Sequence, residues 1–337
     1  MDFSGFFNMV ITMFLVLIVG FILGKTKIID EVSSKGLSKL IIMVAQPALI
    51  IGSITSKKYS LDNLKLALLG VGLSLLLHCV MALIARALCA KIKDFDERKI
   101  TEFALVFGNT GFLGIPLFSV LFPENGAFVS SFFIVGFNVL LWIIGLGIIA
   151  RGREDIKLTP KKIIINKGTI ASFIGFIIFL IPAIPACKSF ELPIFISTAI
   201  NYISGLCTPI TMLLAGALIA RKSLKSIFSK AKIYYLLVLR LVVAPIFFCF
   251  LFKVIGISDI LLKVTDSPDF WVIFLTVALG LPSATSTITF AEVYDTSPEY
   301  AAQCVGATTL FSIATMPCVV LLAKWICTLN ISIFQFF

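Results

Sequence analysis

The sequence contains two interrupted apolar segments, Gly108-Asn109-Thr110-Gly111-Phe112-Leu113-Gly114-Ile115-Pro116 and Leu279-Gly280-Leu281-Pro282-Ser283-Ala284-Thr285-Ser286-Thr287. Each lies inside a charge-free run long enough to cross a bilayer, and each mixes glycine, proline and hydrogen-bonding side chains. An open backbone group in hydrocarbon costs several kcal/mol, so such breaks survive only where they are buried in protein or line a cavity. Paired breaks at matching places in two halves of a chain are typical of the binding site of a transporter.

Around these segments, ten apolar runs fill nearly all of the 337 residues, and the composition is 59% hydrophobic. The runs are Phe3–Gly24, Leu40–Ser56, Leu66–Ala85, Phe103–Pro123, Asn125–Ala150, Gly168–Cys187, Leu192–Ala220, Ile233–Phe252, Phe270–Ala291 and Tyr300–Ala323. A membrane-spanning helix needs about 20 residues. The sequence therefore predicts an all-α integral membrane protein with ten transmembrane helices, forming a single transmembrane domain over residues 1–337.

The basic residues predict the orientation of these helices. Loops after the first, third, fifth and seventh runs carry twenty Lys and Arg residues, whereas loops on the other side carry six. Because basic loops stay in the cytoplasm, we expect the odd-numbered loops to be cytoplasmic and both termini to lie outside. The net charge of +10 is spread over short loops, which favours contact with an anionic lipid bilayer and argues against nucleic acid as a partner.

The sequence offers little for catalysis. Its eight cysteines form no C-x-x-C pair, it has a single histidine, and it lacks an ATP-binding loop. We therefore predict that the protein is not an enzyme and uses no metal and no cofactor.

Proline positions indicate an internal repeat. Pro47, which follows Gln46 in the second run, and Pro209 in the seventh are 162 positions apart, while Pro116 and Pro282 in the interrupted runs are 166 apart. Both offsets are about half of the chain. We interpret these prolines as corresponding helix breaks in runs two and seven and in runs four and nine.

Five runs per half is an odd number, so the second half must enter the membrane from the opposite side. We therefore expect an inverted 5+5 repeat, with residues 1–150 as the first repeat, residues 168–337 as the second, and residues 151–167 as a cytoplasmic linker. Such repeats are common in secondary transporters.

The breaks suggest an anion site. Proline is favoured at the first position of a helix, so we expect the second half of each interrupted helix to begin near Pro116 and near Pro282. The free N–H groups of a helix start carry partial positive charge and attract anions. An alternative is that the Ser and Thr side chains only hold helices together. The candidate substrate-binding residues are Asn109, Thr110, Gly111, Pro116, Asn138, Pro282, Ser283, Ala284, Thr285 and Ser286.

Three ionisable residues lie at membrane depth and are candidates for a charge or proton role. Arg240 lies eight positions after Lys232, and either a functional role or a structural pair would explain it equally well. His78 could carry protons, although simple hydrogen bonding is the favoured interpretation. Glu292 closes the ninth run, where solvation at the interface is favoured.

Together these motifs resemble the auxin efflux carrier family. The similar stretches are Gly108–Leu117, Asn138–Trp142, Leu281–Ala284, Ala291–Tyr294, Pro47–Ile50 and Arg240-Leu241 with Pro245. The resemblance implies a scaffold bundle and a transport bundle, crossed broken helices four and nine, and an elevator-like movement. Similar short-loop bacterial members are often linked to malate, malonate or related organic acids, which implies a bacterial cytoplasmic membrane.

We therefore expect a secondary active transporter of the elevator type that moves a small organic anion, a carboxylate, across the cytoplasmic membrane. The alternative is a sodium-coupled symporter of the bile-acid type with a similar crossover. That alternative calls for acidic or amide ligands at the breaks, where Asn109 is present but no carboxylate is. A channel or receptor, a coupling proton or sodium ion, and a homodimer all remain open at this stage.

Overall fold

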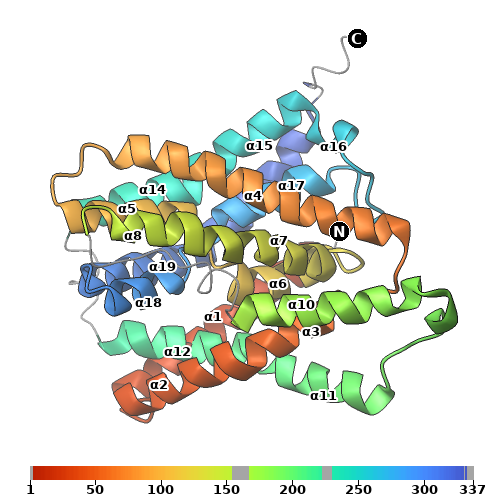
Figure 1. Cartoon of the computed structure of the whole chain (residues 1–337). Coiled ribbons are helices and arrows are strands. Elements are labelled where there is room, and N and C mark those ends of the chain that lie inside the picture. Colours follow the sequence, from red (N-terminus) through yellow and green to blue (C-terminus); the bar gives the residue numbers. More distant parts are fainter. Residues whose placement is uncertain (1–2, 154–166, 222–229, 330, 332–337) are drawn as a thin grey trace. The chain divides into compact units, whose positions relative to one another are not determined.

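The computed structural model describes residues 3–153, 167–221, 230–329 and 331 (Figure 1). Within these residues the secondary structure is helical, with no β-strand beyond two isolated bridges. The predicted all-α class is confirmed. Most of the predicted linker 151–167 and both ends of the chain lie outside the described residues.

In the described part of the chain, seven helices are long and apolar enough to cross a membrane. They are Ser4–Lys25, Glu31–Thr55, Leu61–Cys89, Gly126–Ala150, Ile194–Ala220, Ala231–Ile255 and Pro298–Cys327. Shorter apolar helices cover Thr110–Leu121, Gly168–Ala183 and Phe270–Gly280. These three occur where the sequence predicts spans four, six and nine.

The chain divides into two compact units, each built from separate parts of the sequence. Unit 1 consists of Met1–Ile11, Met81–Gly126 and Lys222–Phe337, and unit 2 of Thr12–Val80 and Ala127–Arg221. Two helices, α1 (Phe3–Lys25) and α4 (Leu61–Cys89), contribute several residues to both units, and a third contributes its first residue, Gly126, to unit 1.

Unit 2 otherwise contains α2 (Glu31–Leu40), α3 (Gln46–Thr55), α7 (Gly126–Leu140), α8 (Leu146–Ala150), α10 (Lys167–Leu180), α11 (Ile194–Gly205) and α12 (Cys207–Arg221), with short η1 (Ile41–Ala45), η3 (Leu141–Gly145), η4 (Ile181–Ala183) and η5 (Pro185–Cys187). Unit 1 contains α5 (Phe95–Val106), η2 (Thr110–Gly114), α6 (Ile115–Leu121), α14 (Ala231–Val238), η6 (Leu239–Val243), α15 (Ala244–Ile255), α16 (Ile257–Ile260), α17 (Phe270–Gly280), α18 (Ser286–Val293) and α19 (Pro298–Cys327). The elements η1, η2, η3 and η6 are single π-helical turns, which often occur at functional sites.

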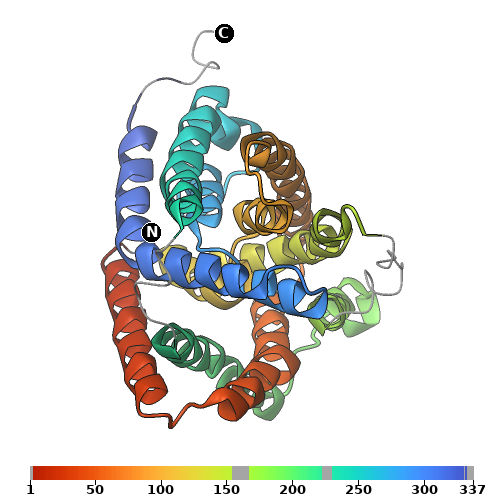
Figure 2. The same ribbon diagram turned by 90° about the vertical axis from the view of Figure 1, so that its left-hand side faces the viewer.

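Small residues bring helices of unit 2 close together. A Cβ atom added to Gly20 of α1 would lie 2.2 Å from the carbonyl oxygen of Leu213 in α12, and one added to Gly216 would lie 2.0 Å from that of Leu17. The two helices are the red and dark green ribbons of Figure 2. Glycine at such contacts is how membrane helices gain packing energy in the absence of a hydrophobic driving force.

The predicted proline breaks of runs two and seven take different forms. Gln46 and Pro47 start α3 directly after the π-helical turn η1, and the helix continues without interruption from Glu31 to Thr55. In run seven the helix breaks at Leu206, and Pro209 lies in the first turn of α12. Pro209 thus occupies a first-turn position, where a missing N–H costs little, whereas Pro47 lies inside a continuous helix, directly after a π-helical turn.

Aromatic side chains pack the interrupted helices of unit 1 against each other. The rings of Phe118 in α6 and Phe274 in α17 stack with centroids 4.1 Å apart, and Phe103 in α5 lies 5.3 Å from Phe290 in α18. The second half of the first interrupted helix therefore lies along the first half of the second one. On the other side of the breaks, α5, the first half of the first interrupted helix, contacts α18, the second half of the second one.

Candidate functional site

The two breaks pair through their main chains. The Asn109 N–H donates to the Pro282 carbonyl at 2.8 Å, and the Ala284 N–H donates to the Phe107 carbonyl at 2.9 Å. These bonds form a short antiparallel bridge. Four backbone groups that the breaks would otherwise leave open in the membrane are thereby satisfied.

The structure corrects where the second half-helices begin. The first begins at Thr110, with Asn109 as its N-cap, so that Pro116 lies within the continuing helix. The second begins at Ser286, while Pro282 lies in the extended link and accepts a hydrogen bond. The prolines predicted the helix starts wrongly, because a polar N-cap residue and strand-like pairing of the two breaks determine where the helices begin.

In the side-chain amide of Asn109, the oxygen accepts a hydrogen bond and the nitrogen donates none within the described part of the chain. Its Oδ1 accepts from the Phe112 N–H at 3.4 Å, and its carbonyl accepts from the N–H groups of Leu113 and Gly114. Its Nδ2 makes no hydrogen bond to any described residue, although the side chain is buried. A buried amide with an unused N–H₂ group is ready to donate to a ligand.

Further open donors surround the two helix starts. Within the described residues, the main-chain N–H groups of Gly111, Thr285 and Ser286 have no acceptor. The hydroxyls of Ser286 and Thr287 are buried and also lack a partner there. The three N–H groups lie at helix starts, where no intrahelical acceptor is available, and the two hydroxyls are exceptions to the rule that buried polar groups find partners. Both kinds of donor are therefore available to a bound ligand.

Ser283 and Thr110 are less open than the sequence suggested. The Ser283 hydroxyl donates to the Ala104 carbonyl at 3.0 Å, and its N–H donates to the Thr308 hydroxyl at 3.1 Å. Thr110 donates its N–H to the Gly108 carbonyl at 2.8 Å. Ser283 therefore ties the second break to α5 and to α19.

Arg240, in the π-helical turn η6, reaches the carbonyl ends of both first half-helices. Its Nε donates to the Leu281 carbonyl at 2.9 Å, and its Nη1 donates to the Leu105 carbonyl. The residue is only 2% exposed, and no described carboxylate lies within ion-pair distance of it. The sequence left a functional and a structural role open for Arg240, and the geometry places its charge directly beside the paired breaks.

Two of the remaining candidate residues belong to unit 2, and the third, Glu292, belongs to unit 1. Asn138 belongs to α7 of unit 2, where its buried Nδ2 has no partner among the described residues. His78, also in unit 2, has its Nδ1 2.7 Å from the Ser74 carbonyl, within reach of a hydrogen bond, and its ring packs on two phenylalanines. Glu292 is exposed at the end of α18.

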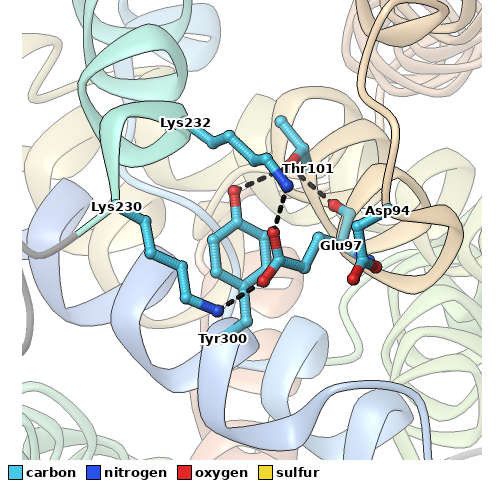
Figure 3. Close-up of polar contacts among 6 residues, drawn as sticks. All are labelled: Asp94, Glu97, Thr101, Lys230, Lys232 and Tyr300. Atoms are coloured by element: carbon cyan, nitrogen blue, oxygen red, sulfur yellow. Dashed lines mark hydrogen bonds and ion pairs between the residues drawn. The ribbon is translucent and has the colours of Figure 1, made fainter.

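A charge cluster that the sequence analysis missed lies at the start of α5 (Figure 3). Lys230 and Lys232 each reach one oxygen of the Glu97 carboxylate. Beneath them the Tyr300 hydroxyl donates to the Thr101 hydroxyl at 2.9 Å, because Thr101 itself donates to the Glu97 carbonyl. The sequence signal was Asp94 followed by Glu97, an acidic N-cap pattern, but it reveals only the helix start.

Burial and charge act in opposite directions on Glu97. Burial raises the pKa of its carboxyl group, but the hydrogen bonds and positive charges of Lys230 and Lys232 outweigh burial and hold the pKa below its usual value. The carboxylate is therefore ionised at neutral pH. This cluster connects α5 to α14 and, through Tyr300, to α19.

Unit 2 also contains a cavity of about 300 Å³ lined by Lys57, Lys58, Tyr59, Glu191 and Asn201 among others. Lys58 and Glu191 form an exposed ion pair at its rim. Among the described residues, no group of three or more His, Cys, Asp or Glu side chains could hold a metal ion.

Comparison with known proteins adds independent information. The model of the family described as "Membrane transport protein" matches residues 6–320. An uncharacterized transporter of Methanocaldococcus jannaschii is 26% identical over 312 residues, 91% of this chain and 95% of that protein. The "Putative malonate transporter" of Rhizobium meliloti is 24% identical over 283 residues, 83% of this chain and 84% of that protein. An uncharacterized transporter of Methanothermobacter thermautotrophicus is 22% identical over 326 residues, 94% of this chain and 98% of that protein.

Proposed function

The chain belongs to the membrane transport protein family, the auxin efflux carrier-like family that its motifs resemble, and on this basis we propose that it is a secondary active transporter for a small carboxylate. The observation that carries the proposal is the set of open hydrogen-bond donors around the paired breaks. The Asn109 Nδ2 group, the N–H groups of Gly111, Thr285 and Ser286, and two buried hydroxyls offer donors without an acceptor among the described residues.

This set fits a carboxylate better than a cation. A carboxylate only accepts hydrogen bonds, and helix N-termini carry partial positive charge. Neither break segment contains an Asp or Glu residue that would hold a metal cation. The Rhizobium relative whose name points to malonate supports a small carboxylate as the substrate class.

Several finer features belong to the same proposal. We assign ten transmembrane helices in an inverted 5+5 repeat, with the short apolar helices of spans four, six and nine completing the set. Unit 1 holds both breaks, so it is the unit that carries substrate in an elevator-type movement, and unit 2 is the scaffold. The protein lies in the cytoplasmic membrane with both termini outside.

The sodium-coupled alternative has weaker support. It calls for acidic or amide ligands at the crossover, where the amide of Asn109 is present but no carboxylate is. Among the described residues, the full charge that contacts the breaks is the positive guanidinium of Arg240. A coupling proton is compatible with the proposal, and the experiment below includes it.

Uptake into proteoliposomes tests the function. Labelled malonate, malate, succinate and acetate are offered separately, with an imposed pH gradient, a sodium gradient or neither. We expect saturable uptake of at least one of these acids, strongly reduced in Asn109→Leu and unchanged in Asn201→Leu, which alters an exposed amide in unit 2. The absence of saturable uptake for all four acids under all gradients would overturn the proposal, and a flux that rises linearly with concentration would indicate a channel.

A further inference from the structure

Arg240 has a place in the charge balance of the breaks that goes beyond holding helices together. Helix C-termini carry partial negative charge, equivalent to about half an elementary charge each. The helices α5 and α17 both end at the breaks, and Arg240 donates to a carbonyl at each of these ends, those of Leu105 and Leu281. One guanidinium thus faces two negative helix ends.

The backbone is shaped around this guanidinium. A Cβ atom added to Gly108 would lie 2.3 Å from Nη2 of Arg240. Only glycine lets the main chain of the first break approach so closely. The side chain is buried, and an arginine remains protonated in proteins, so its positive charge is permanent.

Converging carbonyl oxygens in a buried site are also the ligands that a hard metal cation such as Na⁺ would take. Here the guanidinium occupies them, and its planar fork satisfies two carbonyls at once. Neither break segment carries an Asp or Glu that would neutralise the positive helix starts at Thr110 and Ser286, which sum to about one positive charge. That is enough for one carboxylate.

We propose that Arg240 is a resident cation: it fills the place of a coupling metal ion at the breaks, so that the carrier binds its carboxylate without Na⁺. This inference rests on the proposed function, because it concerns how the same site is charged. Arg240 is then a positioning residue. It neutralises the two negative helix ends and leaves the positive helix starts free for the substrate.

The first test uses the purified full-length protein and malonate as probe. Calorimetry measures malonate affinity in Na⁺ buffer and in choline buffer. We expect the two affinities to agree within twofold for the parent. We expect Arg240→Gln to weaken binding by at least about tenfold, since truncating a buried charged group is costly, and Arg240→Lys, which keeps the charge, to weaken it less. The matched control Arg86→Gln removes an exposed guanidinium and should change nothing.

The second test needs no substrate. The melting temperature of Arg240→Ala is measured in choline, in Na⁺ and with ethylguanidinium, which replaces the deleted group. We expect Na⁺ and ethylguanidinium to stabilise Arg240→Ala but not the parent. An arginine with a purely structural role would lower the melting temperature without making it sensitive to Na⁺.

These outcomes separate the two proposals. Two results would overturn the resident-cation role while leaving the transport function intact. One is that malonate binding by the parent weakens about tenfold or more without Na⁺. The other is that folded Arg240→Gln binds malonate nearly as well as the parent. If the parent binds and transports no carboxylate in either buffer, the proposed function fails, and the melting experiment still decides the role of Arg240. If neither Arg240→Ala nor Arg240→Gln folds, the parent's Na⁺ dependence and the Arg240→Lys affinity decide it.

Discussion

Gly108 has no Cβ atom, and this leaves room for the Arg240 guanidinium beside the first break. Its Cα lies against the Arg240 guanidinium, so Gly108→Ala would force the arginine or the break to move. Overpacking of this kind costs about 1–3 kcal/mol. We expect Gly108→Ala to lower the melting temperature of the purified protein. The control Gly72→Ala, in α4 with nothing within 4 Å of the added carbon, should leave it equal or slightly higher, and equal behaviour of both variants would contradict this account.

Asn109 combines a capping acceptor with an open donor, and substitutions can separate the two. Asn109→Asp keeps an acceptor for the Phe112 N–H but replaces the donor with a negative charge. Asn109→Leu loses both. An unpaired buried group costs about 1–3 kcal/mol, so we expect Asn109→Leu to weaken malonate binding roughly 5- to 150-fold.

Asn109→Asp should bind at least as weakly as Asn109→Leu yet melt close to the parent, since its cap survives. Calorimetry and thermal melting in the same buffer give both values. An affinity within twofold of the parent, in either folded variant, would place the carboxylate elsewhere.

At the scale of elements, α5 is fixed at both ends to span eight. Glu97 joins its first turn to Lys230 and Lys232 (Figure 3). Arg240 holds its last turn at the Leu105 carbonyl. Because a helix clamped at both ends moves with its partner, we interpret α5, α14 and α15 as one rigid part of unit 1.

Acid should weaken the first of these clamps. The pKa of Glu97 lies below its usual value because of the two lysines, so its stabilisation is fully present above the ordinary glutamate pKa of about 4.3 and is lost as the pH falls through the lower folded-state pKa. The carboxylate is 10% exposed and the lysines 44% and 34%, so the lysines reach water and the pairs contribute about 1 kcal/mol. We expect the melting temperature of the parent to exceed that of Glu97→Gln at pH 7, with the difference shrinking in acid.

The comparison at each pH uses Glu31→Gln as control, because Glu31 pairs with Lys35 on an exposed helix face. The melting temperature of the Glu31→Gln variant should equal that of the parent at every pH. A Glu97→Gln deficit that stays constant down to strongly acidic pH would show that the charge pairs are not its cause.

Pro116 tests whether the shape of the second half-helix matters for movement. It lies just after the π-helical turn η2, where a proline lacks the N–H of a regular helix. Pro116→Ala should let this turn relax towards a regular helix. We expect malonate affinity within about twofold of the parent, because the donors at the helix start are unchanged, but slower uptake into proteoliposomes. Equal uptake rates would show that the proline is only a packing residue.

At the scale of the whole molecule, the proposed topology makes a direct prediction. In a cysteine-free background, Thr26→Cys should react with a membrane-impermeant thiol reagent only from the cytoplasmic side. Ser60→Cys and Ser267→Cys should react only from outside. These positions follow the first, second and eighth spans, and labelling of Thr26→Cys and Ser60→Cys from the same side would exclude the ten-helix arrangement.

Much of this protein follows from the sequence alone. Its helical membrane class, the seven long helices and the two breaks are visible as apolar runs, glycines and prolines, because hydrophobicity and chain-breaking act locally and need no knowledge of neighbours. The family follows from the same motifs. The basic-residue count likewise predicts an orientation from the loops alone.

What only the tertiary structure decided is how groups far apart in the chain satisfy one another. Ser283 looked like a ligand but is occupied by Ala104, 179 positions away, whereas Thr287 is buried and open. Proline seemed to start each half-helix, but Asn109 caps the first one and main-chain pairing shapes the second break. The carbonyl partners of Arg240 lie 41 and 135 positions away. Packing sets which donors remain free, because a hydrogen bond depends on distances of a few tenths of an ångström that no local pattern encodes.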